Sequence, residues 1–328
     1  MTDTLPPVYG APPPGKRARS TPLWVMSGGV RQFVALRGRG RVPVLVVHGG
    51  PGASLLPFAR EIAGTTRLED DFALAYWEQR GTGRSRGRLR EHDLTLDGIV
   101  ADCVAVAEAL RDRFGRPPVL VGHSWGSAVG LLAAVRRPDL FAAVLGVGQV
   151  VCVAEGERLS YDWAFEQAQQ AGDKAGLREL RRIGPPPHDH RGMLRERAVL
   201  ARHGGVWRGH GTWALAAGDV WRALRTPEYT LRDLVRQAAD PFFSLRVLVE
   251  EKYTVDLFVQ APRVEVPAHF IAGAHDWTTP SVLVERYVAA FDAPRGKRLI
   301  RFENSAHLPF LEEPAAFEAV VREVAGMA

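Results

Sequence analysis

The stretch Pro118-Val119-Leu120-Val121-Gly122-His123-Ser124-Trp125-Gly126 predicts the centre of the fold. Its apolar part is short, Val/Leu-rich and preceded by prolines, which is typical of a buried strand. The Ala/Leu-rich segment 127–135 ends before Arg136-Arg137-Pro138 and predicts a helix. A G-x-S-x-G sequence between a strand and a helix indicates a nucleophile elbow, whose strained turn presents the hydroxyl at a helix N-terminus. Ser124 is therefore the candidate nucleophile, and a helix-capping serine is the alternative.

A second motif, His48-Gly49-Gly50-Pro51-Gly52, follows the strand-like run 44–47. Acyl transfer needs two backbone N–H groups directed at the developing oxyanion, and glycine lets the backbone approach the substrate closely. In this architecture one donor is the residue after the nucleophile, here Trp125, and the other comes from the loop after an earlier strand. We expect Gly50 to be that second donor, with Gly49 as the alternative. The histidine of the motif is expected to pack the turn, and an ordinary Gly/Pro turn is the simpler interpretation.

Two further residues complete the pattern in the chain order that a serine nucleophile requires, the acid first and then the histidine. Asp276 follows the strand-like run 268–272, and His307 follows the strand-like run 298–302. Both therefore lie beyond the carboxyl ends of strands, where open α/β sheets place their sites. The chemistry assigns their roles: His307 takes the proton of Ser124, and Asp276 fixes the histidine tautomer. Taken singly, each could instead be a helix cap or a loop histidine.

Together these motifs, with Glu78-Gln79-Arg80-Gly81-Thr82-Gly83-Arg84-Ser85, resemble those of the α/β-hydrolases of the proline iminopeptidase group. The H-G-G-P-G motif paired with (D/E)-Q-R-G-x-G-x-S is far more specific than the elbow alone. The resemblance covers roughly residues 28–150 and 262–328. It implies cleavage of an N-terminal proline or another small residue from peptides, while relatives of the group hydrolyse other amides and esters. It implies no metal and no organic cofactor.

The pattern along the chain predicts an α/β fold, a doubly wound and mostly parallel sheet with an inserted helical cap. Strands are expected at 31–37, 72–78 and 141–147, and a helix at 96–114. The elbow and Asp276 are separated by far more chain than one βα unit needs. We therefore predict a hydrolase core of residues 23–150 and 262–328 and a helical, Trp-rich cap of residues 151–261. A separate domain on a linker is the alternative for the insertion.

Composition fits an enzyme of 328 residues with a large core, since 46% of the residues are hydrophobic. The net charge of +5 comes almost wholly from arginines interspersed with acids, so no nucleic-acid partner is expected. Residues 1–22 contain six prolines and are expected to form a disordered tail. No signal-like or membrane-spanning run is found, so a cytoplasmic location without membrane contact is expected. Cys103 and Cys152 lie in apolar runs and are expected to be buried free thiols.

The cap is expected to decide specificity. Aminopeptidases of the group that this chain resembles bind the α-ammonium of the substrate with cap glutamates, since a buried cation needs a carboxylate partner. The segment offers Glu155, Glu157, Glu166, Glu196, Glu250 and Glu251. Glu166 is the preferred candidate because it lies near Trp163, which we include as a substrate-binding candidate. The tryptophan–glutamate signature of the group's caps is absent. His188-Asp189-His190 is expected to be a solvated loop rather than a metal site.

Three kinds of function remain open. The first is a serine hydrolase of a peptide or small amide, with proline iminopeptidase-like activity. The second is an esterase, lactonase, thioesterase or acyl-releasing tailoring enzyme, which would use the same Ser124 acyl-enzyme. The third is a lyase or a non-enzymatic binding protein on the same fold, which an intact triad disfavours. The expected partner is a small molecule or short peptide, and the oligomeric state is left open.

Overall fold

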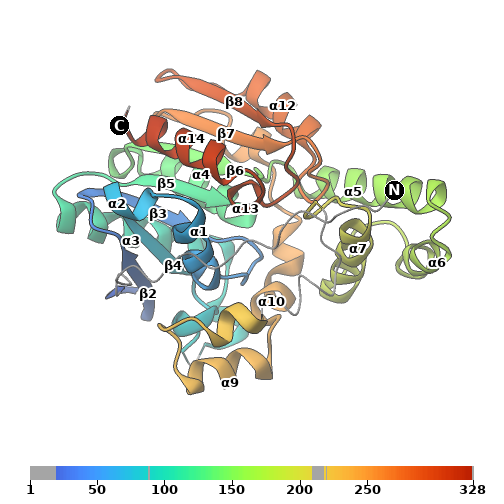
Figure 1. Cartoon of the computed structure of the whole chain (residues 1–328), viewed down its shortest axis with the longest axis horizontal. Helices are drawn as coiled ribbons and strands as arrows, with labels where there is room; N and C mark the ends of the chain where they lie inside the picture. Colours follow the sequence, from blue (N-terminus) through green and yellow to red (C-terminus); the bar gives the residue numbers. More distant parts are fainter. Residues whose placement is uncertain (1–19, 88, 209–217, 219, 327–328) are drawn as a thin grey trace, which may run out of the picture.

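The computed structural model describes residues 20–87, 89–208, 218 and 220–326. An eight-stranded sheet runs through the centre in the order β1-β2-β4-β3-β5-β6-β7-β8 (Figure 1). The first two strands pair antiparallel, as do β2 and β4, and all the other neighbouring strands pair parallel. The strands are β1 (Thr21–Ser27), β2 (Val30–Arg37), β3 (Val42–Val47), β4 (Phe72–Glu78), β5 (Val119–His123), β6 (Ala143–Val147), β7 (Ala268–Gly273) and β8 (Lys297–Phe302). The predicted mostly parallel sheet is confirmed.

Helices pack on both faces of this sheet, because its parallel strands are apolar on both sides. On one face Leu120 packs into a core shared with α3, α4 and α12, while on the other Val119 and Val121 pack with α1 and α14. The sheet is therefore doubly wound, as predicted. Outside the segment between β6 and β7, the described α-helices are α1 (Ala59–Thr65), α2 (Leu68–Asp71), α3 (Leu96–Phe114), α4 (Trp125–Arg136), α12 (Ser281–Ala290), α13 (Pro309–Glu312) and α14 (Pro314–Gly326).

Helix α3 illustrates how local sequence signals set the limits of an element. The Thr95 side chain accepts a hydrogen bond from the backbone N–H of Gly98, which is N-cap geometry. The helix ends at Gly115, whose φ of +69° is a left-handed conformation that glycine adopts without a Cβ penalty. The predicted helix at 96–114 is thus confirmed at both ends.

The N-terminal boundary differs from the sequence expectation. Residues 1–19 of the predicted tail lie outside the described residues, but Thr21 and Pro22 belong to β1. This strand pairs along its whole length with β2, from Thr21 opposite Leu36 to Ser27 opposite Val30. Residues 23–26 are apolar, but the strand lies half-exposed at the edge of the sheet. It was missed because an edge strand is defined by its pairing with a neighbour, here β2, which one segment of sequence does not reveal.

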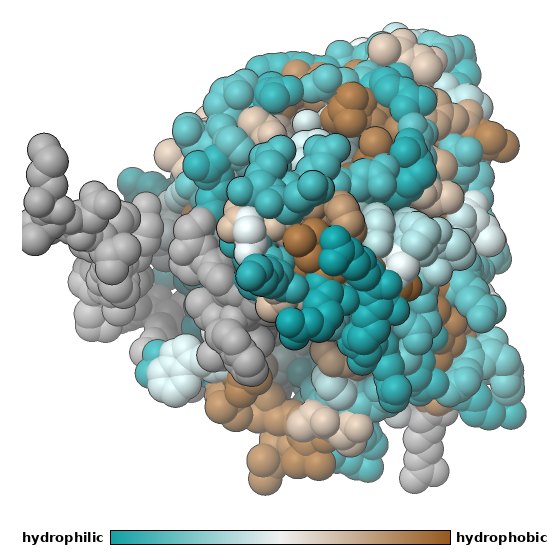
Figure 2. Space-filling view, turned by 90° about the vertical axis from the view of Figure 1, so that its right-hand side faces the viewer, coloured by the Kyte–Doolittle hydropathy of each residue, from teal (hydrophilic) through white to brown (hydrophobic). Residues whose placement is uncertain are grey.

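Helices also fill the segment between β6 and β7, and those that the structure describes fall within the predicted cap limits of 151–261. Those described are α5 (Val153–Gln170), α6 (Lys174–Ile183), α7 (His190–Arg202), α9 (Leu231–Ala239), α10 (Phe243–Lys252) and α11 (Leu257–Gln260). The molecular face that carries α5–α7 is largely hydrophilic, and apolar residues gather toward its lower end (Figure 2). Two residues of α9 belong to this apolar region, since Leu231 is 78% and Val235 is 59% exposed. No helix among the described residues is long and apolar enough to cross a membrane.

Candidate active site

Ser124 lies at the sharp turn between β5 and α4. Its φ of +53° and ψ of −126° make it the one non-glycine residue with positive φ in the described part of the chain. Such a conformation costs about 1–3 kcal/mol and persists only where the surroundings enforce it. A Cβ built on Gly122 would lie 2.6 Å from the carbonyl oxygen of Gly126, and one built on Gly126 would lie 2.2 Å from that of Val47. The glycines two residues before and two residues after the serine therefore make the turn possible.

The turn gives Ser124 the position that a nucleophile needs. Its backbone N–H donates to the carbonyl of Val147 at the end of β6, which fixes the turn against the sheet. The side chain is 9% exposed at the N-terminus of α4, where unpaired N–H groups and the helix dipole favour negative charge. The strand and the helix predicted on either side of Ser124 are both confirmed.

Asp276 and His307 meet beyond the carboxyl ends of β7 and β8. The distance from His307 Nδ1 to Asp276 Oδ2 is 2.8 Å. Oδ1 of the aspartate accepts hydrogen bonds from the backbone N–H groups of Thr278 and Thr279, and Oδ2 accepts one from the Thr279 hydroxyl. Burial raises the pKa of Asp276, but His307 and the Thr279 hydrogen bonds outweigh it, so its pKa lies below the ordinary value. The carboxylate is thus held ionised beside the imidazole.

Ser124 lies close to this pair but is not yet bonded to it. The ring of His123, the residue before the serine, lies 4.7 Å from the ring of His307. Among the described residues no hydrogen bond joins the Ser124 hydroxyl to His307. Contacts of this kind are often long without substrate and shorten when it binds. The structure therefore brings the three predicted residues together while only the acid–histidine half is hydrogen-bonded.

The glycine-rich loop after β3 lies directly beside the serine. A Cβ built on Gly49 would be 2.9 Å from Ser124 Cβ, and Gly50 has a φ of +114° that disfavours any other residue. Trp125 is fully buried as the first residue of α4. The predicted oxyanion donors Gly50 and Trp125, with Gly49 as the alternative, therefore flank the nucleophile on two sides.

His48 packs this loop, as the sequence suggested. Its Nδ1 lies 2.9 Å from the carbonyl oxygen of Gly49, and its Nε2 accepts the backbone N–H of Gln79. Burial lowers the pKa of His48 to about 4, although the hydrogen bond to Gly49 opposes this shift. A histidine that uses both nitrogens in this way stabilises the loop and is not free to transfer protons.

Glu78, the first residue of the E-Q-R-G-T-G-R-S motif, is buried where β4 ends. Its carboxylate accepts hydrogen bonds from the Tyr229 hydroxyl at 2.5 Å, the Ser54 hydroxyl at 3.0 Å and the Arg84 backbone N–H at 2.7 Å. Burial raises the pKa of Glu78 to about 7, against the lowering effect of these hydrogen bonds. The motif thus joins the loop after β3 to Tyr229 in the inserted segment.

These shifts predict how stability depends on pH. Unfolded histidines have a pKa near 6.5, whereas burial lowers the pKa of His48 to about 4 and of His123 to about 3. As the pH falls from 7 to 5, these histidines therefore take up protons in the unfolded chain but not in the folded protein. This lowers the free energy of unfolding by about 2 kcal/mol per histidine. Glu78 acts oppositely, because the fold binds its proton more tightly than the unfolded chain. Between pH 7 and pH 5 the wild type should therefore lose roughly 1–2 kcal/mol in its free energy of unfolding.

Urea denaturation of the wild type and Glu78→Gln at pH 7, 6 and 5 measures this balance. Without the compensating carboxyl, the variant should lose about 4 kcal/mol over the same range, roughly twice the wild-type loss or more. An equal pH slope in the two proteins would show that Glu78 does not titrate in this window.

The two substrate-binding candidates of the cap differ in their placement. Trp163 on α5 stacks on Trp277, the residue after Asp276, with ring centroids 5.0 Å apart and an interplanar angle of 10°. The backbone N–H of Trp277 donates to Gly205, so two segments of the insertion contact the Asp276 loop. Glu166 lies on the exposed side of α5. Trp163 is thus placed to align α5 with the site, whereas Glu166 faces solvent.

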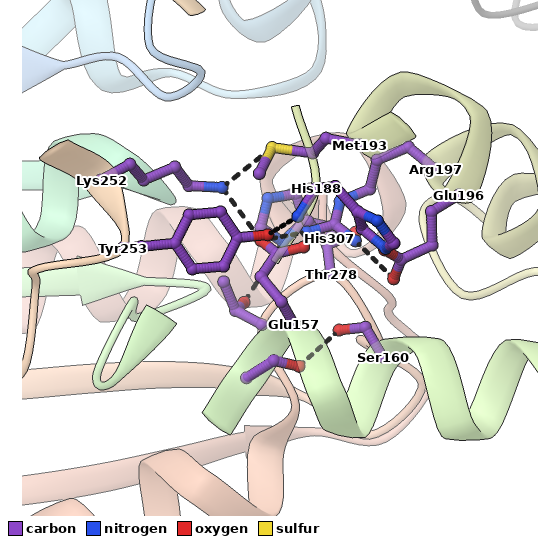
Figure 3. A network of polar contacts seen from close by, with 12 residues as sticks. Glu157, Ser160, His188, Met193, Glu196, Arg197, Lys252, Tyr253, Thr278 and His307 are labelled. Carbon is purple, nitrogen blue, oxygen red and sulfur yellow. Dashed lines mark hydrogen bonds and ion pairs between the residues drawn. The ribbon is translucent and has the colours of Figure 1, made fainter. Parts of the chain in front are cut away.

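The inserted segment between β6 and β7 contains a buried network of ion pairs (Figure 3). Glu157 on α5 accepts hydrogen bonds at Oε1 from Lys252 of α10 at 2.9 Å and Arg197 of α7 at 2.7 Å. Arg197 also pairs with Glu196, whose Oε2 lies 3.0 Å from His188 Nε2. Burial raises the pKa of Glu157, but Arg197 and Lys252 outweigh it and leave the pKa below its ordinary value. The network therefore ties three helices of the insertion together through compensated charges.

Sequence reasoning named Glu157 and Glu196 as members of a larger set but overlooked Lys252. The available signal was its rarity, since the chain has only four lysines and this one ends the largely apolar helix α10. His188 belongs to this network, and Asp189 caps α7 by accepting the backbone N–H of Gly192. His188 is buried, so the expectation of a solvated loop is wrong for this residue, and Asp189 has a structural role as a helix cap.

The strained serine turn, the glycine loop and the Asp276–His307 pair on a doubly wound sheet define a hydrolase of the α/β class. Residues 42–314 match the α/β-hydrolase fold family, and the chain belongs to that family. It is 31% identical over 280 residues to the "Probable aminopeptidase YbaC" of Bacillus subtilis, which spans 84% of this chain and 86% of that protein. The chain is therefore a hydrolase with aminopeptidase-like relatives, as the sequence resemblance predicted.

Two further similarities concern a shorter stretch of sequence and a shared fold. The "Proline iminopeptidase" of Neisseria meningitidis serogroup A is 36% identical over 112 residues, which is 34% of each chain. The structure of an esterase from Exiguobacterium antarcticum superposes with a TM-score of 0.62 at 16% identity, covering 92% of this chain and 98% of that one. At that identity the esterase shows a shared fold alone.

Proposed function

We propose that this protein is a serine hydrolase that acts through an acyl-enzyme on Ser124, with His307 as base and Asp276 as its orienting acid. The observation that carries the proposal is the 2.8 Å contact of His307 and Asp276 beside a serine held at positive φ. His307 Nε2 takes the proton as Ser124 Oγ attacks the carbonyl, then returns it to the leaving group. Water, activated by the same histidine, hydrolyses the acyl-enzyme.

The oxyanion that forms in each step is stabilised by backbone N–H groups. We assign these donors to Trp125 and Gly50, with Gly49 as the alternative, because the two segments flank Ser124. Such donors are each worth about 3–4 kcal/mol of transition-state stabilisation. The N-terminus of α4 adds its dipole in the same direction.

For the substrate, we propose the release of an N-terminal residue from a peptide or small amide. The proposal draws on the similarity to YbaC and on Glu157, whose Oε2 is buried without a hydrogen-bond partner. An unpaired buried carboxylate oxygen is costly, and a substrate ammonium group would satisfy it. Glu157 replaces Glu166 in this role because Glu166 is exposed.

The test compares L-prolyl- and L-alanyl-naphthylamide with their N-acetyl derivatives. If the site requires a free amine, acetylation should lower kcat/KM by about 100-fold or more. Glu157→Gln should lower kcat/KM for the free amines by about 10- to 100-fold, the worth of a charged hydrogen bond. Glu166→Gln, on the exposed side of the same helix, is the matched control and should stay within about 3-fold of wild type.

Ester or lactone hydrolysis is the second candidate, and one observation favours it. Lys252 and Arg197 already compensate the charge of Glu157, so the insertion does not require a cation from the substrate. This candidate predicts that short-chain nitrophenyl esters are cleaved faster than naphthylamides and that N-acetylation is without effect. Equal rates on L-prolyl-naphthylamide and its N-acetyl derivative would exclude the aminopeptidase proposal.

A further inference from the structure

His123, the residue before Ser124, is buried in the site, yet the proposed chemistry does not use it. It is the last residue of β5 and is 7% exposed. Its Nε2 lies 2.8 Å from the backbone carbonyl oxygen of His307, a residue 184 positions later in the chain. A side chain that joins the nucleophile strand to the histidine loop can influence how the two approach each other.

The hydrogen bond fixes the chemical state of the His123 ring. A carbonyl oxygen can only accept, so Nε2 must carry the proton and donate it. Burial first, and the neighbouring His307 second, lower the pKa of His123 to about 3. The ring is therefore neutral at physiological pH, and it adds no positive charge beside His307 when that residue is protonated during turnover.

Three polar atoms of His307, its backbone N–H, its carbonyl and Nδ1, are each held by a contact. Its backbone N–H donates to the carbonyl of Val206, its Nδ1 pairs with Asp276, and its carbonyl accepts from His123. Each of these partners comes from a different segment. The atom left for chemistry is Nε2, and its position is set by these three contacts.

The His123 ring also contacts other residues of the candidate site. Its centroid lies 4.7 Å from that of His307 and 5.1 Å from that of Phe310, which it meets edge to face. A Cβ built on Gly49 would lie 3.3 Å from His123 Nδ1. His123 thus contacts the histidine loop and the oxyanion loop while being covalently joined to the nucleophile.

We propose that His123 is a positioning residue, which donates its Nε2–H to the His307 carbonyl and so holds the His307 imidazole within reach of Ser124. The proposal rests on the Ser124–His307–Asp276 function argued above. A displacement of about 1 Å between reacting groups can cost about 100-fold in rate. Loss of the hydrogen bond leaves a buried carbonyl unpaired, so the loop moves to find another partner.

Three substitutions distinguish the contribution of the His123 hydrogen bond from that of the packing of its ring. His123→Gln places an amide nitrogen near the position of Nε2 and keeps the donor. His123→Phe keeps the ring volume but removes the donor, and His123→Asn is polar but too short to reach the carbonyl. We expect the Phe and Asn variants to lose about 10- to 100-fold in kcat with KM within about 3-fold, and the Gln variant to stay within about 3-fold of wild-type kcat.

The readouts are steady-state kinetics, the rate of Ser124 labelling by a fluorophosphonate, and the thermal midpoint. Labelling should slow in step with kcat in the Phe and Asn variants and recover in the Gln variant. His269→Phe is the matched control, because His269 is a buried histidine on β7 whose ring nitrogens have no hydrogen-bond partner. It should keep the wild-type kcat and labelling rate.

Wild-type kcat in His123→Phe, or equal losses in the Phe and Gln variants, would overturn the positioning role while leaving the Ser124 chemistry intact. Failure of the wild type to label at Ser124 would overturn the proposed function and this inference with it. If the Phe variant does not fold, the comparison of Asn with Gln decides the question by the same criteria.

Discussion

Replacing Ser124 by alanine should abolish hydrolysis, with kcat falling by about 10⁴- to 10⁶-fold, because the acyl-enzyme then cannot form. The turn should tolerate the change, since alanine also has a Cβ and the strain of the φ of +53° is already present in the wild type. The Ser124 side chain is no cap for α4, so the helix should not lose a hydrogen bond. We therefore expect a loss of activity with little change in the thermal midpoint.

A fluorophosphonate probe measures the same prediction covalently. Wild-type protein should become labelled at Ser124, as located by peptide mass spectrometry, and Ser124→Ala should take up no label. Labelling at another serine, together with residual turnover in the alanine variant, would show that the nucleophile is elsewhere.

Asp276→Asn should lower kcat by about 10³- to 10⁴-fold through the wrong histidine tautomer. Oδ1 of Asp276 accepts two backbone N–H groups, so the asparagine oxygen should remain there and its NH₂ should point at His307. Nδ1 would then have to accept, which places the proton on Nε2, the atom that must take the proton from Ser124. The two backbone hydrogen bonds to Oδ1 are kept, and the Thr279 hydroxyl, which donates to Oδ2 in the wild type, can accept from the new NH₂ group instead, so the fold should remain stable.

Asp292→Asn is the matched control for this substitution. Asp292 is exposed, follows the last residues of α12 and pairs with Arg263, so its loss should leave kcat within about 2-fold of wild type. Near-normal turnover in Asp276→Asn at an unchanged thermal midpoint would identify another carboxylate as the partner of His307.

The sheet was predictable because its signals are local. Runs such as Val119–Val121 are apolar throughout, as parallel strands buried on both faces must be. Helix α3 carries its own limits in Thr95 and Gly115. Strand β1 escaped prediction because an edge strand is defined by its pairing with β2, and pairing is not visible in one segment alone.

The candidate site divides in the same way. Chain order and strand ends placed Ser124, Asp276 and His307, since parallel strands bring their carboxyl ends to one edge of the sheet. The insertion has no such rule, because helices that pack on one another can present any of several residues inward. The exposed Glu166 and the buried Glu157 lie on the same helix, and only packing against α7 and α10 distinguishes them.

The sequence by itself determined the architecture and the class of hydrolase, and it singled out the three candidate residues Ser124, Asp276 and His307, because each rests on a short motif whose geometry is set by neighbouring residues. The tertiary structure alone decided that Lys252 and Arg197 compensate Glu157, that Glu78 meets Tyr229, and that His123 binds the His307 carbonyl. These contacts join residues far apart in the chain, and burial gives them their strength by removing water. Neither the proximity of distant residues nor their burial can be predicted from a single stretch of sequence.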